Sequence, residues 1–224
     1  MPPVGDKRSE RAQAGGREVQ RQQTRKRVYT AALTEFKRAG LADADVGAIA
    51  AAAGVARGTF YFHFPTKEHV VAELERSEEA RVVAQLSKFL VQLEARGDAA
   101  PAGPGFLPAA LAEVVRLVTA MERRVGKTLF REMLGLHFSP RRPALLPGAD
   151  QWAEYPIITV LVAVVQRARE RDEVYAGADA LHTAQFFMVG LYAMLITSHD
   201  SPRAARAEIL DNFLATVVRG VESR

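Results

Sequence analysis

The sequence predicts an all-α fold of about nine helices. Apolar residues recur with helical spacing along nearly all of the 224 residues, and no segment shows the sustained alternation of a strand. In segment 24–39, for example, Val28, Ala32 and Phe36 lie four residues apart and share one helix face. We expect the remaining helices at 45–53, 56–62, 66–96, 106–124, 127–137, 150–172, 178–198 and 203–221.

Composition favours a soluble, cytoplasmic protein that does not enter a membrane. Hydrophobic residues make up 48% of the chain and charged residues 25%, which is usual for globular proteins. The apolar run 157–165 is far shorter than the ~20 residues of a membrane span. The absence of cysteine excludes disulfides and thiolate chemistry, and segment 1–27 is polar rather than an apolar signal peptide.

The positive charge is concentrated in the first third of the chain. Residues 1–69 hold 12 basic and 7 acidic side chains, whereas the remaining 155 residues hold 18 and 19. Clustered positive charge suits a surface that binds nucleic-acid phosphates. A basic, solvated tail is the alternative interpretation. Residues 1–23 lack apolar periodicity and are expected to form a disordered basic arm, followed by domains at 24–71 and 72–224.

Segment 45–67 has the pattern of a helix-turn-helix. Asp45 is a suitable N-cap for the first helix, and Gly54 stands where a sharp turn needs a positive φ. The following short helix is expected to bury Phe60 and to project polar and aromatic side chains outward. Two helices joined by a tight glycine-containing turn are typical of proteins that read the DNA major groove.

The run IAAAAGVARGTFYFHFPTKE resembles the DNA-binding signature of the TetR family of regulators, and TRKRVYTAALTEFKRAG resembles that family's first helix. The resemblance covers residues 24–71. It implies that the positions meeting DNA are Arg57, Gly58, Thr59, Tyr61, Phe62, His63 and Lys67.

These positions suggest different contacts. Arg57 is suited to hydrogen bonding with guanine, and Thr59 is suited to contact with a phosphate or a thymine methyl group. Tyr61 and His63 suit phosphates, although Tyr61, like Phe62, could instead pack in the core. Lys67 matches a lysine that contacts the DNA backbone.

The sequence departs from the family pattern at two places. Ala56 stands where relatives often have a capping Ser or Thr, and Gly47 and Ala48 replace polar residues that contact phosphates. Basic residues of the N-terminal segment, Arg25 among them, are expected to supply backbone contacts instead.

The sequence shows no catalytic or metal-binding constellation. It contains no H-E-x-x-H, P-loop, G-x-S-x-G or G-x-G-x-x-G motif. We therefore expect no enzyme activity, catalytic residue, metal or cofactor. His137 and His182 fall in apolar helices, where a histidine is usually part of the core.

The last two helices are apolar on more than one face and so require burial on more than one side. The family resemblance implies that they pair with their copies in a homodimer, which would read a palindromic operator in double-stranded DNA. A well-buried monomer core is the alternative. The expected dimer residues are Leu181, Met188, Leu191, Leu195, Leu210, Phe213, Leu214 and Val217. A second apolar stripe of the same segment contains Phe186 and Val189.

The middle helices are rich in large side chains that could line a pocket for an apolar or aromatic small-molecule effector. The candidate lining residues are Phe106, Met121, Phe130, Met133, His137, Trp152, Tyr155, Gln166, Gln185 and Tyr192. We expect a homodimeric repressor that the ligand releases from DNA, with activation as an alternative. An architectural DNA-binding protein without an effector, and a helical enzyme or ligand carrier that retains the motif, are the competing hypotheses.

Overall fold

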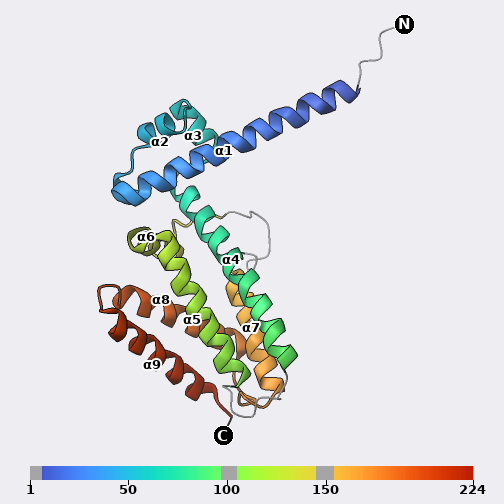
Figure 1. Ribbon diagram of the computed structural model, residues 1–224, viewed down its shortest axis with the longest axis vertical. Helices are drawn as coiled ribbons and strands as arrows, with labels where there is room; N and C mark the ends of the chain where they lie inside the picture. Colours follow the sequence, from blue (N-terminus) through green and yellow to red (C-terminus); the bar gives the residue numbers. More distant parts are fainter. Residues whose placement is uncertain (1–6, 97–104, 145–153, 224) are drawn as a thin grey trace. The chain divides into compact units, whose positions relative to one another are not determined.

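The computed structural model describes residues 7–96, 105–144 and 154–223, and every regular element in these ranges is a helix (Figure 1). The all-α prediction is therefore confirmed. An isolated antiparallel bridge joins Val174 and Glu222. The helices are α1 (Lys7–Asp43), α2 (Val46–Ala52), α3 (Arg57–His63), α4 (Lys67–Arg96), α5 (Phe106–Val125), α6 (Lys127–His137), α7 (Pro156–Glu170), α8 (Ala180–Thr197) and α9 (Arg203–Val221).

The chain forms two compact units, Met1–Val71 and Ala72–Arg224. We call them the N-terminal and the C-terminal unit. The boundary between them falls inside α4. The N-terminal unit contains α1, α2 and α3.

The N-terminal unit is built around a small aromatic core. Phe36 of α1, Ile49 of α2 and Phe60 of α3 are fully buried. The Asp45 side chain accepts a hydrogen bond from the Gly47 amide at 2.8 Å and so caps α2, as the sequence predicts. Gly54 has φ 65°, which allows the sharp turn between α2 and α3.

Helix α1 begins at Lys7, well before the N-cap expected at Thr24, and extends beyond α2 and α3 (Figure 1). The expectation of a disordered arm is wrong for residues 7–23, and residues 1–6 lie outside the described ranges. Strong helix formers predominate in this stretch, and Gln22 donates to Glu18 one turn away at 2.7 Å. Side-chain propensity therefore maintains a helix that apolar periodicity does not reveal.

The core of the C-terminal unit centres on α5 and α8. Helix α5 packs against α6, α7 and α9, and α8 packs against α7 and α9. Fully buried side chains fill the space between them, among them Leu111, Met121, Phe130, Leu161 and Phe187.

Helix α8 is long and apolar enough to cross a membrane, judged by length and composition alone. One such helix is weak support for a span, because the core helices of soluble proteins meet the same criteria. Here Phe187, Leu191 and Leu195 of α8 are fully buried in the protein's own core.

Charged side chains also stabilise the C-terminal unit. The Glu173 carboxylate accepts hydrogen bonds from the amides of Phe106 and Leu107, each at 2.8 Å. These amides belong to the first turn of α5, where no preceding carbonyl is available to them. A residue 66 positions away along the chain therefore caps α5.

We expect Glu173→Ala to lower the free energy of unfolding by about 1–3 kcal/mol, because it leaves two partly buried amides unsatisfied. Urea denaturation measures the change. Glu170→Ala is the control, since Glu170 is an exposed residue whose partner among the described residues is Arg167 of its own helix. Equal stability of the two variants would contradict the capping role.

Candidate DNA-binding surface and ligand cavity

Helix α3 presents one exposed face. Arg57 and Gly58 are exposed, and the side chains of Tyr61 and Phe62 have exposed fractions of 44% and 70%. Phe60, on the opposite side of the helix, is fully buried and contacts the Tyr61 ring edge-on at 5.3 Å between centroids. Phe62 is thus not a core residue, although the sequence left that possibility open.

Two other predicted contact residues of α3 are half-buried. Thr59 lies near the start of the helix and His63 at its end. Partial burial lowers the pKa of His63, and the nearby positive charges of Arg25 and Arg21 lower it further. His63 therefore favours its neutral form, which still has one N–H donor.

Basic residues of α1 lie beside α3. The Arg25 guanidinium lies over the Phe64 ring, 4.6 Å from its centroid. Arg17, Arg21 and Arg25 are spaced four residues apart and so follow one face of α1. Arg17 and Arg21 therefore continue the positive charge of Arg25, which lies near His63, along two further turns of α1.

Lys67 has a structural role that the sequence did not suggest. Its ammonium group donates to the carbonyl oxygens of Ala42 and Ala44 at 2.8 and 3.2 Å. These carbonyls lie at the end of α1 and in the connection to α2. Lys67 thus fixes the segment that leads into the helix-turn-helix, and one ammonium hydrogen is left over for a DNA phosphate.

A cavity of about 490 Å³ lies in the C-terminal unit. Four of the predicted pocket residues line it: His137, Tyr155, Gln185 and Tyr192. The remaining lining residues are Glu79, Phe138, Ile157, Ile158, Met188 and Val189. The volume and the largely apolar and aromatic walls are those of a small-molecule site.

The other predicted pocket residues lie elsewhere. Phe106, Met121, Phe130 and Met133 are buried in the core and are not among the cavity's lining residues. Gln166 lines a separate polar hollow between α7 and the start of α8. Trp152 lies outside the described residues. Sequence enrichment in large side chains therefore did not distinguish cavity walls from core.

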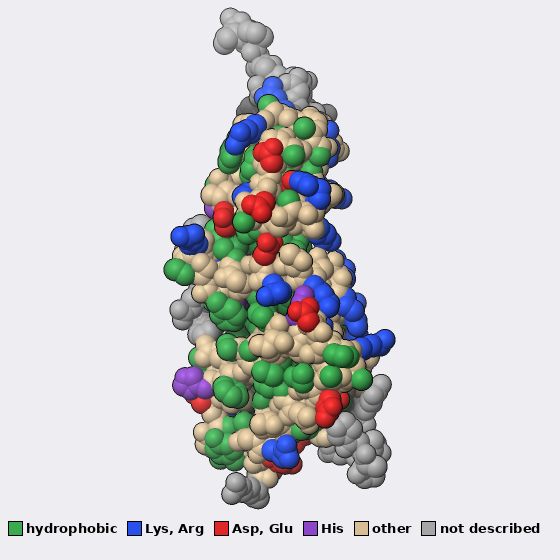
Figure 2. Space-filling model, turned by 90° about the vertical axis from the view of Figure 1, so that its left-hand side faces the viewer, with side chains coloured by type: hydrophobic (Ala, Val, Ile, Leu, Met, Phe, Trp, Pro, Cys, Tyr) green, Lys and Arg blue, Asp and Glu red, His purple; other side chains and the backbone are tan. Residues whose placement is uncertain are grey.

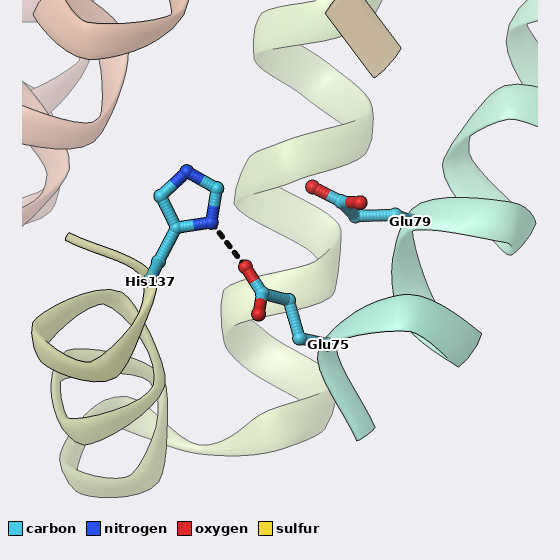
Figure 3. Close-up of side chains that lie close together, drawn as sticks. All are labelled: Glu75, Glu79 and His137. Atoms are coloured by element: carbon cyan, nitrogen blue, oxygen red, sulfur yellow. Dashed lines mark hydrogen bonds and ion pairs between the residues drawn. The ribbon is translucent and has the colours of Figure 1, made fainter. Parts of the chain in front are cut away.

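One acidic side chain, Glu79, lines the cavity, and Glu75 lies one helical turn before it on α4. Figure 3 shows Glu75 and Glu79 projecting from α4 towards His137 of α6. His137 Nδ1 donates to Glu75 Oε1, and Arg142 Nε donates to Glu75 Oε2 at 3.2 Å. Both oxygens of Glu75 are thus engaged.

Burial changes the titration of two groups that line the cavity. Burial, together with the nearby Glu75 carboxylate, raises the pKa of Glu79 to about 8, whereas Arg142 opposes the shift. Burial, followed by the charges of Glu79 and Glu75, also raises the pKa of the Tyr192 hydroxyl. Both groups are therefore neutral at about pH 7 in the free protein.

Glu75, Glu79 and His137 offer ligand atoms within 4.8 Å of one another, a donor set that suits a divalent metal. Metal binding here would have to displace the hydrogen bond between Glu75 and His137. The sequence analysis missed both glutamates, although a signal existed: the apolar stripe from Val71 to Val82 passes through Glu75 with helical spacing.

The structure buries five of the eight predicted dimer residues in the core of the C-terminal unit. Met188, Leu191, Leu195, Leu210 and Val217 are buried inside the C-terminal unit, and Leu181, Phe213 and Leu214 are half-buried. Phe213 stacks on Phe187 at 5.8 Å between ring centroids, in a space that a side chain at Gly190 would fill.

The exposed apolar residues of α8 belong to the second stripe. Phe186 and Val189 have exposed fractions of 70% and 52%. Figure 2 shows hydrophobic side chains gathered in groups on this unit between scattered charges.

Comparison with known proteins agrees with this geometry. Residues 28–74 match the sequence profile of the bacterial regulatory proteins of the tetR family. The chain is 36% identical over 61 residues to the HTH-type transcriptional regulator AcrR of Shigella flexneri. The aligned segment spans 27% of this chain and only 28% of that relative.

Solved structures resemble the fold over most of its length. FadR of Thermus thermophilus, a TetR-family transcriptional repressor in complex with lauroyl-CoA, has a TM-score of 0.61 at 20% identity, covering 89% of this chain and 96% of that chain. RolR in complex with resorcinol has a TM-score of 0.61 at 18% identity, covering 92% and 91%. Residues 28–74 thus match the DNA-binding segment of the bacterial tetR family, and most of the chain has a fold similar to that of FadR and RolR.

Proposed function

We propose that the protein is a homodimeric transcriptional repressor of the cytoplasm that a small molecule releases from a palindromic operator. The observation that carries this proposal is the exposed face of α3, where Arg57, Tyr61 and Phe62 project from a helix anchored by Phe60. A helix held in this way can enter the major groove without reorganising.

The exposed residues divide between base reading and backbone contact. Arg57, at the start of α3, suits bidentate hydrogen bonding to guanine. Tyr61 donates its hydroxyl to a phosphate, and Phe62 packs against sugar or a thymine methyl group. Arg25 and Arg21 neutralise phosphates beside His63. Lys67 adds one contact while it fixes the helix-turn-helix.

Dimerisation follows from the size of the reading helix. Seven residues of α3 contact only a few base pairs, whereas a two-fold dimer reads two half-sites about 34 Å apart. The exposed stripe of Phe186 and Val189 on α8 supplies apolar surface for the partner subunit. In this arrangement the partner subunit contacts the stripe of Phe186 and Val189. The stripe that contains Leu191, which the sequence analysis favours for the dimer, faces the core instead.

The cavity supports control by a ligand. FadR and RolR were solved with lauroyl-CoA and with resorcinol, both at least partly apolar molecules. The aromatic walls here likewise suit an apolar or aromatic body. A tenfold loss of DNA affinity requires about 1.4 kcal/mol of coupling between the two sites. An architectural protein without an effector would have no need of a cavity of about 490 Å³.

Selection of bound fragments from a random duplex pool should yield a palindrome. On that duplex we expect Arg57→Ala to weaken binding about ten- to hundredfold, because it removes a bidentate pair of hydrogen bonds to guanine. Fluorescence anisotropy measures the change. Arg116→Ala, which removes an exposed arginine of α5, serves as the control. No enrichment of any sequence by the folded wild-type protein would refute the proposal.

We expect substitution of both Arg17 and Arg21 by Gln to flatten the salt dependence of operator binding. The slope of log K against log salt should fall by about 0.9 for each phosphate that the variant no longer neutralises. Titrations at several salt concentrations measure this slope. An unchanged slope would show that this part of α1 does not touch DNA.

We expect Phe186→Asp to shift the protein towards monomer and to weaken operator binding, because it places a charge in the proposed apolar interface. Sedimentation equilibrium measures the assembly state. Val91→Asp is the matched control, since Val91 of α4 is 67% exposed and lies outside the stripe. If both variants remain dimers, the interface lies elsewhere.

A further inference from the structure

Glu79 differs from the other buried acids of the C-terminal unit. Among the described residues, Glu78 pairs with Arg124 and Glu122 with Arg206, each at 2.7 Å. Glu79 is only 3% exposed, yet no hydrogen bond or ion pair engages it anywhere in the described ranges. A buried polar group without a partner is costly, so it suggests a partner that arrives with a ligand.

The Glu79 carboxyl lines the ligand cavity rather than a closed core. Its helix position places it next to Glu75, whose two oxygens are already bound by His137 and Arg142. Glu79 is therefore the acceptor that a ligand can reach without breaking an existing bond.

The charges facing Glu79 favour a cation. Glu75 of α4 and Glu154, which precedes α7, both raise its pKa, and Arg142 is the charge among the described residues that lowers it. Arg142 is itself committed to Glu75 at 3.2 Å and to Glu154 at 3.5 Å. An anionic ligand would be repelled by the carboxylates of Glu75 and Glu154, which share Arg142, whereas a cation would be attracted to them.

The cavity walls are suited to the same type of ligand. Phe138, Tyr155 and Tyr192 contribute aromatic rings, and the ring of His137 contacts all three edge-on. The Arg142 guanidinium lies 5.3 Å from the centre of the Tyr155 ring, so this aromatic group already accepts one cation. Aromatic faces stabilise organic cations that have left water.

We propose that the effector is an organic cation, an amine with an apolar or aromatic body, whose ammonium group binds the Glu79 carboxylate. The inference rests on the proposed ligand control and specifies the class of ligand. Glu79 determines specificity: it selects protonated amines over neutral molecules of the same shape. A divalent metal fits less well, since it must displace His137 from Glu75 to complete its ligand set.

The test compares two probes of equal shape, naphthylmethylamine and the neutral naphthylmethanol, by isothermal titration calorimetry with the full chain. At about pH 8.5, where most of the Glu79 carboxyl is ionised, we expect the amine to bind wild type at least about tenfold more tightly than the alcohol, as for hydrogen bonds to charged groups. Glu79→Gln should remove this preference. Glu78→Gln, the adjacent acid that pairs with Arg124, should retain it.

A measurement on wild type alone gives a second readout that needs no variant. Because the free carboxyl is protonated below about pH 8, amine binding must release a proton. The affinity for the amine should rise almost tenfold per pH unit between about pH 6 and pH 8, and it should change little just above pH 8. Burial, Glu75, Glu154 and Arg142 set this range, and His137, Tyr155 and Tyr192 line the same cavity. Glu79→Gln should remove this dependence of the affinity on pH.

Several outcomes would overturn the proposal. These are equal binding of the two probes, no detectable amine binding by folded wild type, or a preference that survives Glu79→Gln. Thermal stabilisation by Zn²⁺ or Mn²⁺ alone, lost in Glu79→Gln, would assign the site to a metal. None of these affects operator selection by the ligand-free protein, so failure here is distinguishable from failure of the DNA-binding proposal.

Discussion

The burial of Phe60 is the constraint on which the DNA-binding surface depends. Helix α3 has seven residues and no side-chain cap at Ala56, so it is too short to be stable alone. Phe60 is fully buried and fixes the rotation of the helix about its axis. That rotation determines that Arg57 and Tyr61 face solvent. Packing thereby provides the rigidity that local sequence does not.

Local sequence signals are sufficient to predict the helix-turn-helix, but they are not sufficient to predict how the helices of the C-terminal unit pack. The Asp45 cap and the Gly54 turn depend only on neighbouring residues, so the sequence predicts them correctly. An apolar helix such as α8, however, has two candidate faces. Periodicity cannot decide which of them meets the protein's own core, so the stripe containing Leu191 was assigned to the partner although it is fully buried.

The buried acids required the tertiary structure for a different reason. Helical spacing places Glu75 within the apolar stripe of α4, but the sequence does not show that His137 and Arg142 lie beside it. Those partners are more than 60 positions away along the chain. A charge in an apolar stripe is therefore a usable signal for a buried site, although its partners become visible only in the fold.

Glu79 makes the free protein less stable than it could be. Its pKa rises from 4.5 to about 8 on folding, so the folded state binds this proton more tightly than the unfolded state. The contribution of Glu79 to stability is therefore retained below about pH 4.5 and lost progressively as the pH rises to about 8. At about pH 7 the folded group is therefore mostly protonated, and ionising it costs on the order of 1 kcal/mol. A cation that binds Glu79 must supply that energy, and in return it gains a carboxylate that has no competing partner within the described part of the chain. The same burial that weakens the empty protein thus makes the cavity selective for the charged ligand.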